Sequence, residues 1–221
     1  MNRTAVVAGA TGLIGKELVQ LLLNDVAYRA VTILVRRPTG MVHPKLVEQI
    51  IDFDQLQQAD VQMGGADVFC TLGTTIKKAG SQDAFRKVDY QYPLSLGQLA
   101  SRQGARQLLL VSAIGANPSS RAFYNRVKGE VEEALSSLKL PVLHILRPSL
   151  LLGERKEFRF GERIAASLSV LLSPLFSGPL RKYAPVQAST VAKAMIFAAK
   201  SNQAGIHIHE NEHIVKLKQE K

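Results

Sequence analysis

A glycine-rich segment near the start of the chain constrains the fold more than any other feature. The segment reads Gly9, Ala10, Thr11, Gly12, Leu13, Ile14, Gly15; it follows a β-branched apolar run at 4–8 and opens a stretch with helical spacing that reaches Leu23. Glycine is needed in such a turn wherever a Cβ would block a ligand or the packing of helix on strand. Backbone N–H groups and the helix dipole then favour a bound pyrophosphate. We therefore expect a dinucleotide to bind at residues Gly9, Thr11, Gly12, Leu13, Ile14 and Gly15.

The alternation of strand and helix continues along the first 150 residues. Buried strands are predicted at 31–35, 47–51, 67–72, 107–111 and 141–146. Helices are predicted over 82–103 and from a cap at Ser119 or Ser120 to about Leu138. This rhythm is typical of βαβ units, whose parallel sheet is covered on both faces. The sequence therefore predicts an α/β protein with a doubly wound parallel sheet, the Rossmann fold.

The alternation weakens after Pro148. A charged stretch at 153–163 and an uncharged stretch at 164–180 precede a predicted helix at 189–199, a strand at 206–209 and a basic tail. We expect a single domain over 1–221, with its core at about 1–150 and a small C-terminal substrate lobe at about 151–221. The uncharged stretch has three interpretations: core packing of the lobe, a lid over an apolar substrate, or contact with a partner or membrane surface.

Composition and charge exclude several classes of protein. Hydrophobic residues make up 46% of the 221 residues and charged residues 21%, which excludes a disordered or collagen-like chain. The net charge is +10, but it is spread along the chain without a run of five basic residues or interleaved aromatics. A nucleic-acid-binding surface would concentrate that charge on one face. We expect a basic surface or an anionic ligand, and no specific nucleic-acid partner.

The single cysteine and the pattern of hydropathy indicate the cellular compartment in which the protein is expected. The single Cys70 lies in an apolar run, so a reduced interior suits it. No stretch of 18 or more consecutive apolar residues is present, and the first apolar run is too short for a secretory signal. We therefore expect a cytoplasmic protein without a transmembrane segment. The sequence leaves the oligomeric state open, a homo-oligomer included.

The end of the second predicted strand indicates which dinucleotide binds. An NAD enzyme places a carboxylate there for the ribose hydroxyls, whereas this chain has Arg36 and Arg37, 21 and 22 residues after Gly15. Two guanidiniums suit a 2′-phosphate, so NADP(H) is preferred over the alternative of a solvated strand end. Further cofactor contacts are expected after the third and fourth strands. They are Asp52 and Phe53 at the adenine, and the backbone of Leu72, Gly73 and Thr74.

Three polar residues form a candidate catalytic group. Tyr124 and Lys128 are spaced to share one helix face, and Ser112 ends the fifth predicted strand. A carbonyl that accepts a hydride must also receive a proton, and a phenol with a pKa near 10 donates poorly at neutral pH. A nearby ammonium stabilises the phenolate, and a serine hydroxyl can orient the substrate oxygen. We expect Ser112, Tyr124 and Lys128 to be catalytic; a surface Tyr–Lys pair is the alternative.

The histidines do not match a metal site. His207 and His209 face one side of a predicted strand and His213 follows, but no carboxylate or cysteine accompanies them in a ligand pattern. We expect a solvated strand edge here and no bound metal. His144, in the sixth strand, is expected to be a satisfied core residue, and Cys70 a buried hydrophobe.

Several motifs resemble those of atypical short-chain dehydrogenase/reductases. They are the 9–15 turn, the Arg36–Arg37 pair, Leu-Gly-Thr-Thr at 72–75, Val-Ser-Ala-Ile-Gly-Ala at 111–116, Tyr-Asn-Arg-Val-Lys-Gly-Glu at 124–130 and Leu-Arg-Pro-Ser-Leu-Leu-Leu-Gly at 146–153. The likeness is closest to Tat-interacting-protein-like proteins and bacterial NAD(P)-binding proteins similar to nucleoside-diphosphate-sugar epimerases.

The resemblance carries its own implications for the site. It implies that Ser112, Tyr124 and Lys128 form the active-site triad, that Lys128 also holds the nicotinamide ribose, and that Pro148 to Leu150 contact the nicotinamide. Where the family has a helical Asn, this chain has Asp89, which removes support for an Asn-dependent proton relay.

Two functions follow from these features. The first is an NADP(H)-dependent oxidoreductase that acts on a small-molecule carbonyl or alcohol. The alternative is a non-catalytic NADP(H)-binding regulator of a protein partner, since some relatives keep the cofactor fold as regulators. A nucleic-acid-associated protein is a weaker third class.

Overall fold

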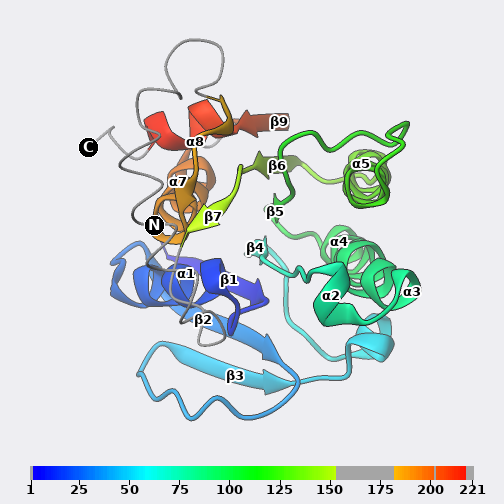
Figure 1. Cartoon of the computed structure of the whole chain (residues 1–221). Helices are drawn as coiled ribbons and strands as arrows, with labels where there is room; N and C mark the ends of the chain where they lie inside the picture. The colour runs from blue at the N-terminus through cyan, green and yellow to red at the C-terminus, as the bar shows by residue number, and fades with distance from the viewer. Residues whose placement is uncertain (1, 153–181, 202, 218–221) are drawn as a thin grey trace.

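The computed structural model describes residues 2–152, 182–201 and 203–217. Within these ranges seven strands form one parallel sheet in the order β3-β2-β1-β4-β5-β6-β9 (Figure 1). Its strands are β1 (Arg3–Ala8), β2 (Tyr28–Val35), β3 (Leu46–Ile50), β4 (Asp67–Cys70), β5 (Gln107–Val111), β6 (Val142–Arg147) and β9 (Gly205–Glu210). A second, two-stranded sheet pairs β7 (Leu151–Leu152) with β8 (Val186–Gln187).

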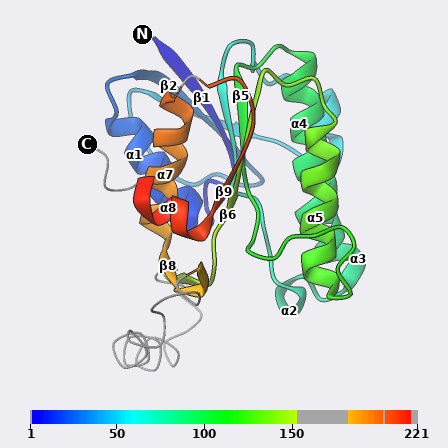
Figure 2. The same ribbon diagram turned by 90° about the horizontal axis from the view of Figure 1, so that it is seen from above.

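Helices cover both faces of the large sheet (Figure 2). On one face lie α1 (Leu13–Asn24), α7 (Ala188–Lys200) and α8 (Asn211–Leu217). On the other face lie the 3-10 helix η1 (Phe53–Gln58), α4 (Tyr92–Arg102) and α5 (Phe123–Ser136). Each face has its own apolar core, and all five residues of β5 are buried between the two. The predicted doubly wound Rossmann sheet is confirmed.

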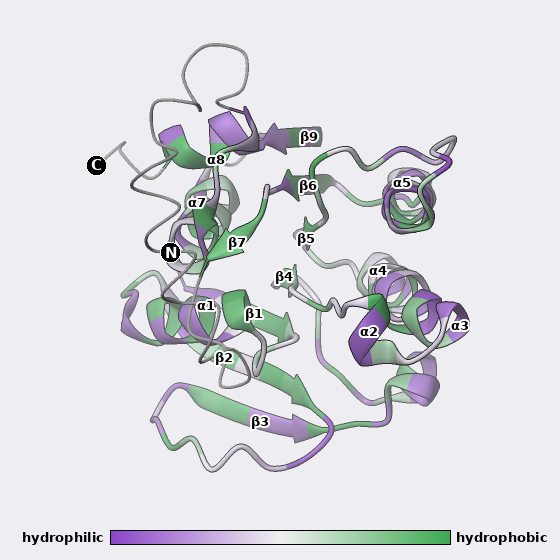
Figure 3. Ribbon diagram, viewed as in Figure 1, coloured by the Kyte–Doolittle hydropathy of each residue, from purple (hydrophilic) through white to green (hydrophobic). Residues whose placement is uncertain are grey.

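The C-terminal segment completes the sheet. β9 pairs in parallel with β6 along its whole length, and α7 packs beside α1 through small buried residues such as Ala192 and Ala199. The elements α7, β9 and α8 therefore pack as part of the large sheet and its covering layer. Figure 3 shows the hydropathy of these elements along the ribbon. The start of the predicted basic tail is instead α8, because Ile214 and Leu217 join the core. The uncharged stretch at 164–180 lies outside the described residues.

Two of the predicted helices have different boundaries in the structure. The expected helix at 82–103 is divided into α3 (Gln82–Arg86), a π-helical turn η2 (Lys87–Gln91) and α4, and the turn places Asp89 inside the protein. The helix expected from Ser119 or Ser120 begins at Phe123 with no side-chain cap. Ser120 instead accepts a hydrogen bond from the N–H of Ala122, because the chain turns there before the helix starts.

A short helix, α2 (Ile76–Ala79), follows β4. No helix in the described ranges has the length and apolar character to cross a membrane.

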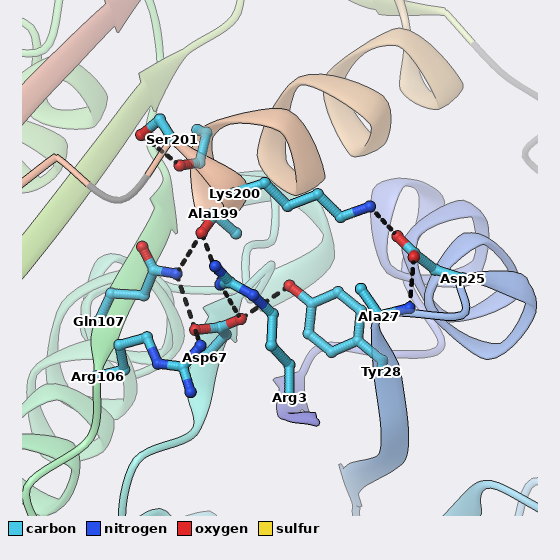
Figure 4. A network of polar contacts seen from close by, with 11 residues as sticks. Arg3, Asp25, Ala27, Tyr28, Asp67, Arg106, Gln107, Ala199, Lys200 and Ser201 are labelled. Carbon is cyan, nitrogen blue, oxygen red and sulfur yellow. Dashed lines mark hydrogen bonds and ion pairs between the residues drawn. The ribbon is translucent and has the colours of Figure 1, made fainter. Parts of the chain in front are cut away.

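A buried polar network joins the amino ends of four strands (Figure 4). The carboxylate of Asp67, at the start of β4, accepts hydrogen bonds from Arg3 Nη1 at 3.0 Å, Tyr28 Oη at 2.8 Å and Gln107 Nε2 at 2.8 Å. Arg3 and Gln107 also donate to the carbonyl of Ala199, each at 2.8 Å, and so hold the end of α7. Burial and the Asp67 carboxylate raise the pKa of Tyr28 far above its ordinary value, so its hydroxyl remains a donor.

We predict that Asp67→Ala lowers the free energy of unfolding by about 3–5 kcal/mol, because it leaves the Arg3 guanidinium buried without its carboxylate. Lys200→Ala is the matched control. It removes the ion pair to Asp25 at 2.5 Å, but the Lys200 side chain is 42% exposed, so the loss should be about 0–1 kcal/mol. Denaturant titration of the two variants measures both values. Equal losses would contradict the role given to Asp67.

Candidate cofactor and active site

The glycine turn leaves the start of α1 open to a ligand. Gly9 has φ of +91°, and a Cβ there would lie 2.6 Å from the Thr71 carbonyl carbon. A Cβ on Gly15 would lie 2.1 Å from the Gly9 oxygen, so α1 can pack this closely only with glycine. The N-cap residue Gly12 makes no side-chain cap bond, and the first turn of α1 carries no acidic residue. Exposed backbone at Thr11 and Gly12 therefore fits an anion.

The predicted turn residues divide into two groups. Thr11 and Gly12 are exposed, Gly9 and Leu13 are half-buried, and Ile14 and Gly15 are buried beneath the turn. A Cβ at Gly9 would collide with Thr71, so glycine is what allows the turn to lie against the segment that follows β4. Ile14 and Gly15 serve the site by packing α1 onto the sheet.

Arg36 and Arg37 follow β2 and are both exposed, and neither makes an ion pair with another described residue. Asp52 is also exposed, and its Oδ1 accepts the N–H of Asp54 at 2.9 Å, which caps η1. Phe53 is 6% exposed, and its ring packs against that of Tyr92 at 5.4 Å between centroids, so it lies in the apolar core on this face of the sheet.

The loop after β4 lies against a buried ion pair. Gly73 is exposed, and Leu72 and Thr74 are half-buried. The N–H of Thr74 donates to Asp89 Oδ2 at 2.9 Å. A Cβ on Gly73 would lie 3.5 Å from Asp89 Oδ1 and 4.0 Å from Lys128 Nζ, so the loop passes directly beside both charged groups.

Tyr124 and Lys128 lie on one face of α5, as predicted. Tyr124 is 36% exposed, and its ring packs 5.6 Å from that of Phe85. Lys128 is buried, and its Nζ is 2.8 Å from Asp89 Oδ1. Burial would lower the pKa of the Lys128 ammonium, but the Asp89 carboxylate and the Tyr124 phenol hold it above its ordinary value. A charged lysine therefore lies next to a phenol that solvent can reach.

Ser112 makes a different contact from the one expected. Its buried hydroxyl donates to Oε1 of Glu132, which lies on α5 and is also buried. Arg147 binds the same carboxylate through Nε at 3.1 and 3.2 Å and through Nη2 at 2.5 Å. In the structure, the Ser112 hydroxyl is therefore bonded to a carboxylate that is also ion-paired with Arg147. The sequence signal for Glu132 was a charged residue one turn after Lys128 on the buried face of the helix.

The segment after β6 borders the end of β5. The carbonyl of Pro148 accepts the N–H of Ile114 at 2.9 Å, and the N–H of Ser149 donates to Asn211 Oδ1 at 3.0 Å. Pro148 is buried, whereas Leu150 is 68% exposed and can meet a ligand. Backbone bonds therefore fix the segment that was expected at the nicotinamide.

The histidines form a packed row at the edge of the sheet. His144 Nδ1 and His209 Nε2 are 3.0 Å apart, His209 Nδ1 and His213 Nδ1 are 3.2 Å apart, and His144 stacks on His207. Burial lowers the pKa of His144 to about 3 and that of His209 to about 4.

The expectations for these histidines hold only in part. His144 is a core residue as predicted, but its Nε2 has no hydrogen-bond partner among the described residues, and His209 is buried rather than solvated. The described ranges contain no group of three or more His, Cys, Asp or Glu residues arranged to hold a metal. Cys70 is free and buried, as predicted, and burial raises its thiol pKa to about 12.

Known proteins have sequences similar to this chain. A family model described as NAD(P)H-binding matches residues 9–158. Protein HTATIP2 of Rattus norvegicus is 34% identical over 221 residues, which cover 98% of this chain and 89% of that protein. Protein FMP52, mitochondrial, of Candida albicans is 34% identical over 201 residues, which cover 88% of this chain and 87% of that protein.

Solved structures share the fold. A short-chain dehydrogenase/reductase superfamily protein from Agrobacterium tumefaciens with bound NAD has a TM-score of 0.66 at 16% identity, over 94% of this chain and 77% of that chain. Together these matches confirm the predicted family, the Rossmann fold and an NAD(P) cofactor. They contradict the prediction of a cytoplasmic protein, because several relatives are named as mitochondrial proteins.

We predict that Gly12→Ala and Gly15→Ala fail in different ways. A Cβ on Gly12 would lie 3.2 Å from the Gly9 oxygen, which a small shift accommodates, so the fold should persist while the added methyl weakens NAD(P)H binding. Gly15→Ala should destabilise the protein itself, because its Cβ overlaps the Gly9 carbonyl. Thermal unfolding and cofactor fluorescence titration separate the two effects. A Gly12→Ala variant with unchanged cofactor affinity would contradict the placement of the pyrophosphate.

Proposed function

The chain belongs to the NAD(P)H-binding family, and from that premise we propose that it is an NADP(H)-dependent oxidoreductase of the short-chain type, acting on a carbonyl or alcohol substrate. One observation carries the proposal. Tyr124 lies one helical turn before Lys128, whose buried, charged ammonium borders the 73–74 loop. The accessible phenol and the fixed positive charge are the two groups that proton transfer to a substrate oxygen requires.

The preference for NADP(H) rests on Arg36 and Arg37. Both guanidiniums are exposed at the carboxyl end of β2, where a cofactor lying along the turn at 9–15 would bring its adenosine ribose. No carboxylate occupies either position. A 2′-phosphate would receive charge-assisted hydrogen bonds from one or both guanidiniums, which NADH cannot accept.

The mechanism assigns a separate role to each residue. The bound cofactor supplies or accepts the hydride. Tyr124 Oη donates its proton to the substrate oxygen during reduction and takes it back during oxidation. Lys128 stabilises the phenolate by its charge. Ser112 can orient the substrate oxygen only if its hydroxyl leaves Glu132, so the proposal depends first on Tyr124 and Lys128.

The bond between Ser112 and Glu132 also favours a second function. With the Ser112 hydroxyl held by a buried carboxylate, the site can bind a cofactor without the third group of the predicted triad. The protein would then act as an NADP(H)-binding regulator of a protein partner. A test of turnover distinguishes the two functions.

We predict that NADPH binds more tightly than NADH, and that replacing both Arg36 and Arg37 by Ala reduces this preference at least about tenfold. The reason is that each charge-assisted hydrogen bond to the 2′-phosphate contributes roughly 1.5–3 kcal/mol. Arg29→Ala is the matched control, because Arg29 is exposed on the same strand at its opposite end. Fluorescence titration gives the affinities. Equal affinity of the unmodified protein for the two cofactors would overturn the assignment.

We predict that Tyr124→Phe keeps NADPH affinity but lowers turnover of a carbonyl substrate roughly 10²–10⁴-fold, the size of a lost general acid. Lys128→Ala should lower both affinity and turnover, because it removes a charge and a ribose contact together. Tyr90→Phe removes another partly exposed phenol and should change neither. The assay follows NADPH consumption across a panel of aldehydes and ketones. If the whole panel gives no turnover, the regulator replaces the enzyme.

A further inference from the structure

The ammonium of Lys128 lies in a place where water cannot balance its charge. The Lys128 side chain is 4% exposed and that of Asp89 is 1% exposed, and the two meet at 2.8 Å. Apart from this contact with Lys128, Asp89 Oδ1 has no polar partner among the described residues, so Lys128 is its counter-charge. A lysine this deeply buried tends to lose its proton unless an opposite charge is close.

Two other ionisable side chains lie around Lys128. Tyr124 lies one turn earlier on α5, and Cys70 ends β4. Burial raises the pKa of the Cys70 thiol to about 12, so it carries no charge at neutral pH. Asp89 is the one carboxylate beside Lys128 among the described residues.

The two oxygens of Asp89 have different partners. Oδ1 faces Lys128 on α5, and Oδ2 accepts the N–H of Thr74 in the loop after β4. The π-helical turn at 87–91 aims the carboxylate inward between these elements. Such turns widen a helix locally and are frequent at functional sites. One side chain thus joins the lysine of the site to the loop where the backbone is expected to border the cofactor.

We propose that Asp89 is a positioning residue that keeps Lys128 charged and fixed beside Tyr124, and that ties it to the 73–74 loop. This inference rests on the proposed function for its catalytic meaning, but the charge state of Lys128 can be measured in the protein alone. In this proposal, the ion pair between Asp89 and Lys128 stands where the family resemblance would place a proton relay through a helical Asn.

Asp89→Asn tests the proposal, because it keeps the size of the side chain and an acceptor for Thr74 but removes the charge. NMR of ¹³Cε- and ¹⁵Nζ-labelled lysine follows Lys128, whose signal is identified by its loss in Lys128→Arg. In the unmodified protein this signal should not titrate below pH ~10, and in Asp89→Asn its midpoint should fall by about 2 units or more. Because the charged form is lost as pH rises through that midpoint, NADPH affinity and any turnover should decline at correspondingly lower pH. A midpoint that does not move overturns the proposal.

Two control variants separate charge from structure. Asp54→Asn removes an equally short ion pair, to Lys87 at 2.8 Å, but both of its side chains are about half exposed and the Lys128 midpoint should stay in place. Asp89→Glu restores a carboxylate and should return the midpoint toward that of the unmodified protein. A uniform loss of activity with an unmoved pH profile would show a merely structural role and would overturn the inference.

Failure of the variant to fold, or a lack of turnover in every variant, would also give a clear answer about the proposal. If Asp89→Asn does not fold, adding Lys128→Met should restore folding, because the unpaired ammonium is removed; continued failure to fold overturns the proposal. If the midpoint falls as expected while no carbonyl is turned over, the oxidoreductase function fails and the role of Asp89 in charging Lys128 stands.

Discussion

The close approach of α1 to the end of β1 is the constraint on which the rest of the molecule depends. A Cβ at Gly15 would lie 2.1 Å from the Gly9 oxygen, and a Cβ at Gly9 would lie 2.6 Å from Thr71. Both contacts are possible only without side chains, and they bring the helix, β1 and β4 together. The same contacts bring the uncapped first turn of α1 to the place where the cofactor phosphates are expected. One set of missing Cβ atoms therefore accounts for this packing and for the expected binding site.

Buried charges then distinguish the two ends of the sheet. At the amino end, Asp67 is surrounded by donors from three other strands, and its network closes on the end of α7. At the carboxyl end, Asp89 faces Lys128 with fewer hydrogen bonds, and Tyr124 beside it remains open to solvent. Buried ions without full hydrogen bonding are costly, and such cost is usual where a site needs a charge ready for chemistry. The first cluster holds strands together, and the second places a buried ion pair beside a solvent-accessible phenol.

Much of the fold and part of the site could be read from local patterns. The turn at 9–15 was recognisable because glycine spacing between a strand and a helix has few other causes. Arg36 and Arg37 were placed correctly at the end of β2, since their position depends only on where that strand stops. Tyr124 and Lys128 share a helix face because four residues make about one turn. The doubly wound architecture was expected because parallel crossovers are right-handed.

Contacts between residues far apart in sequence decided the remainder. Ser112 meets Glu132 and Arg147, Asp89 meets Lys128, and Phe53 turns into the core against Tyr92. No periodicity encodes these pairings, because each partner comes from a different element. The membership of α7 and β9 in the sheet was likewise hidden, since a strand pattern does not say which neighbour it joins. The sequence by itself determined the Rossmann fold and the cofactor turn, where geometry is local. Only the tertiary structure decided which buried charges face each other, because that depends on how the elements pack.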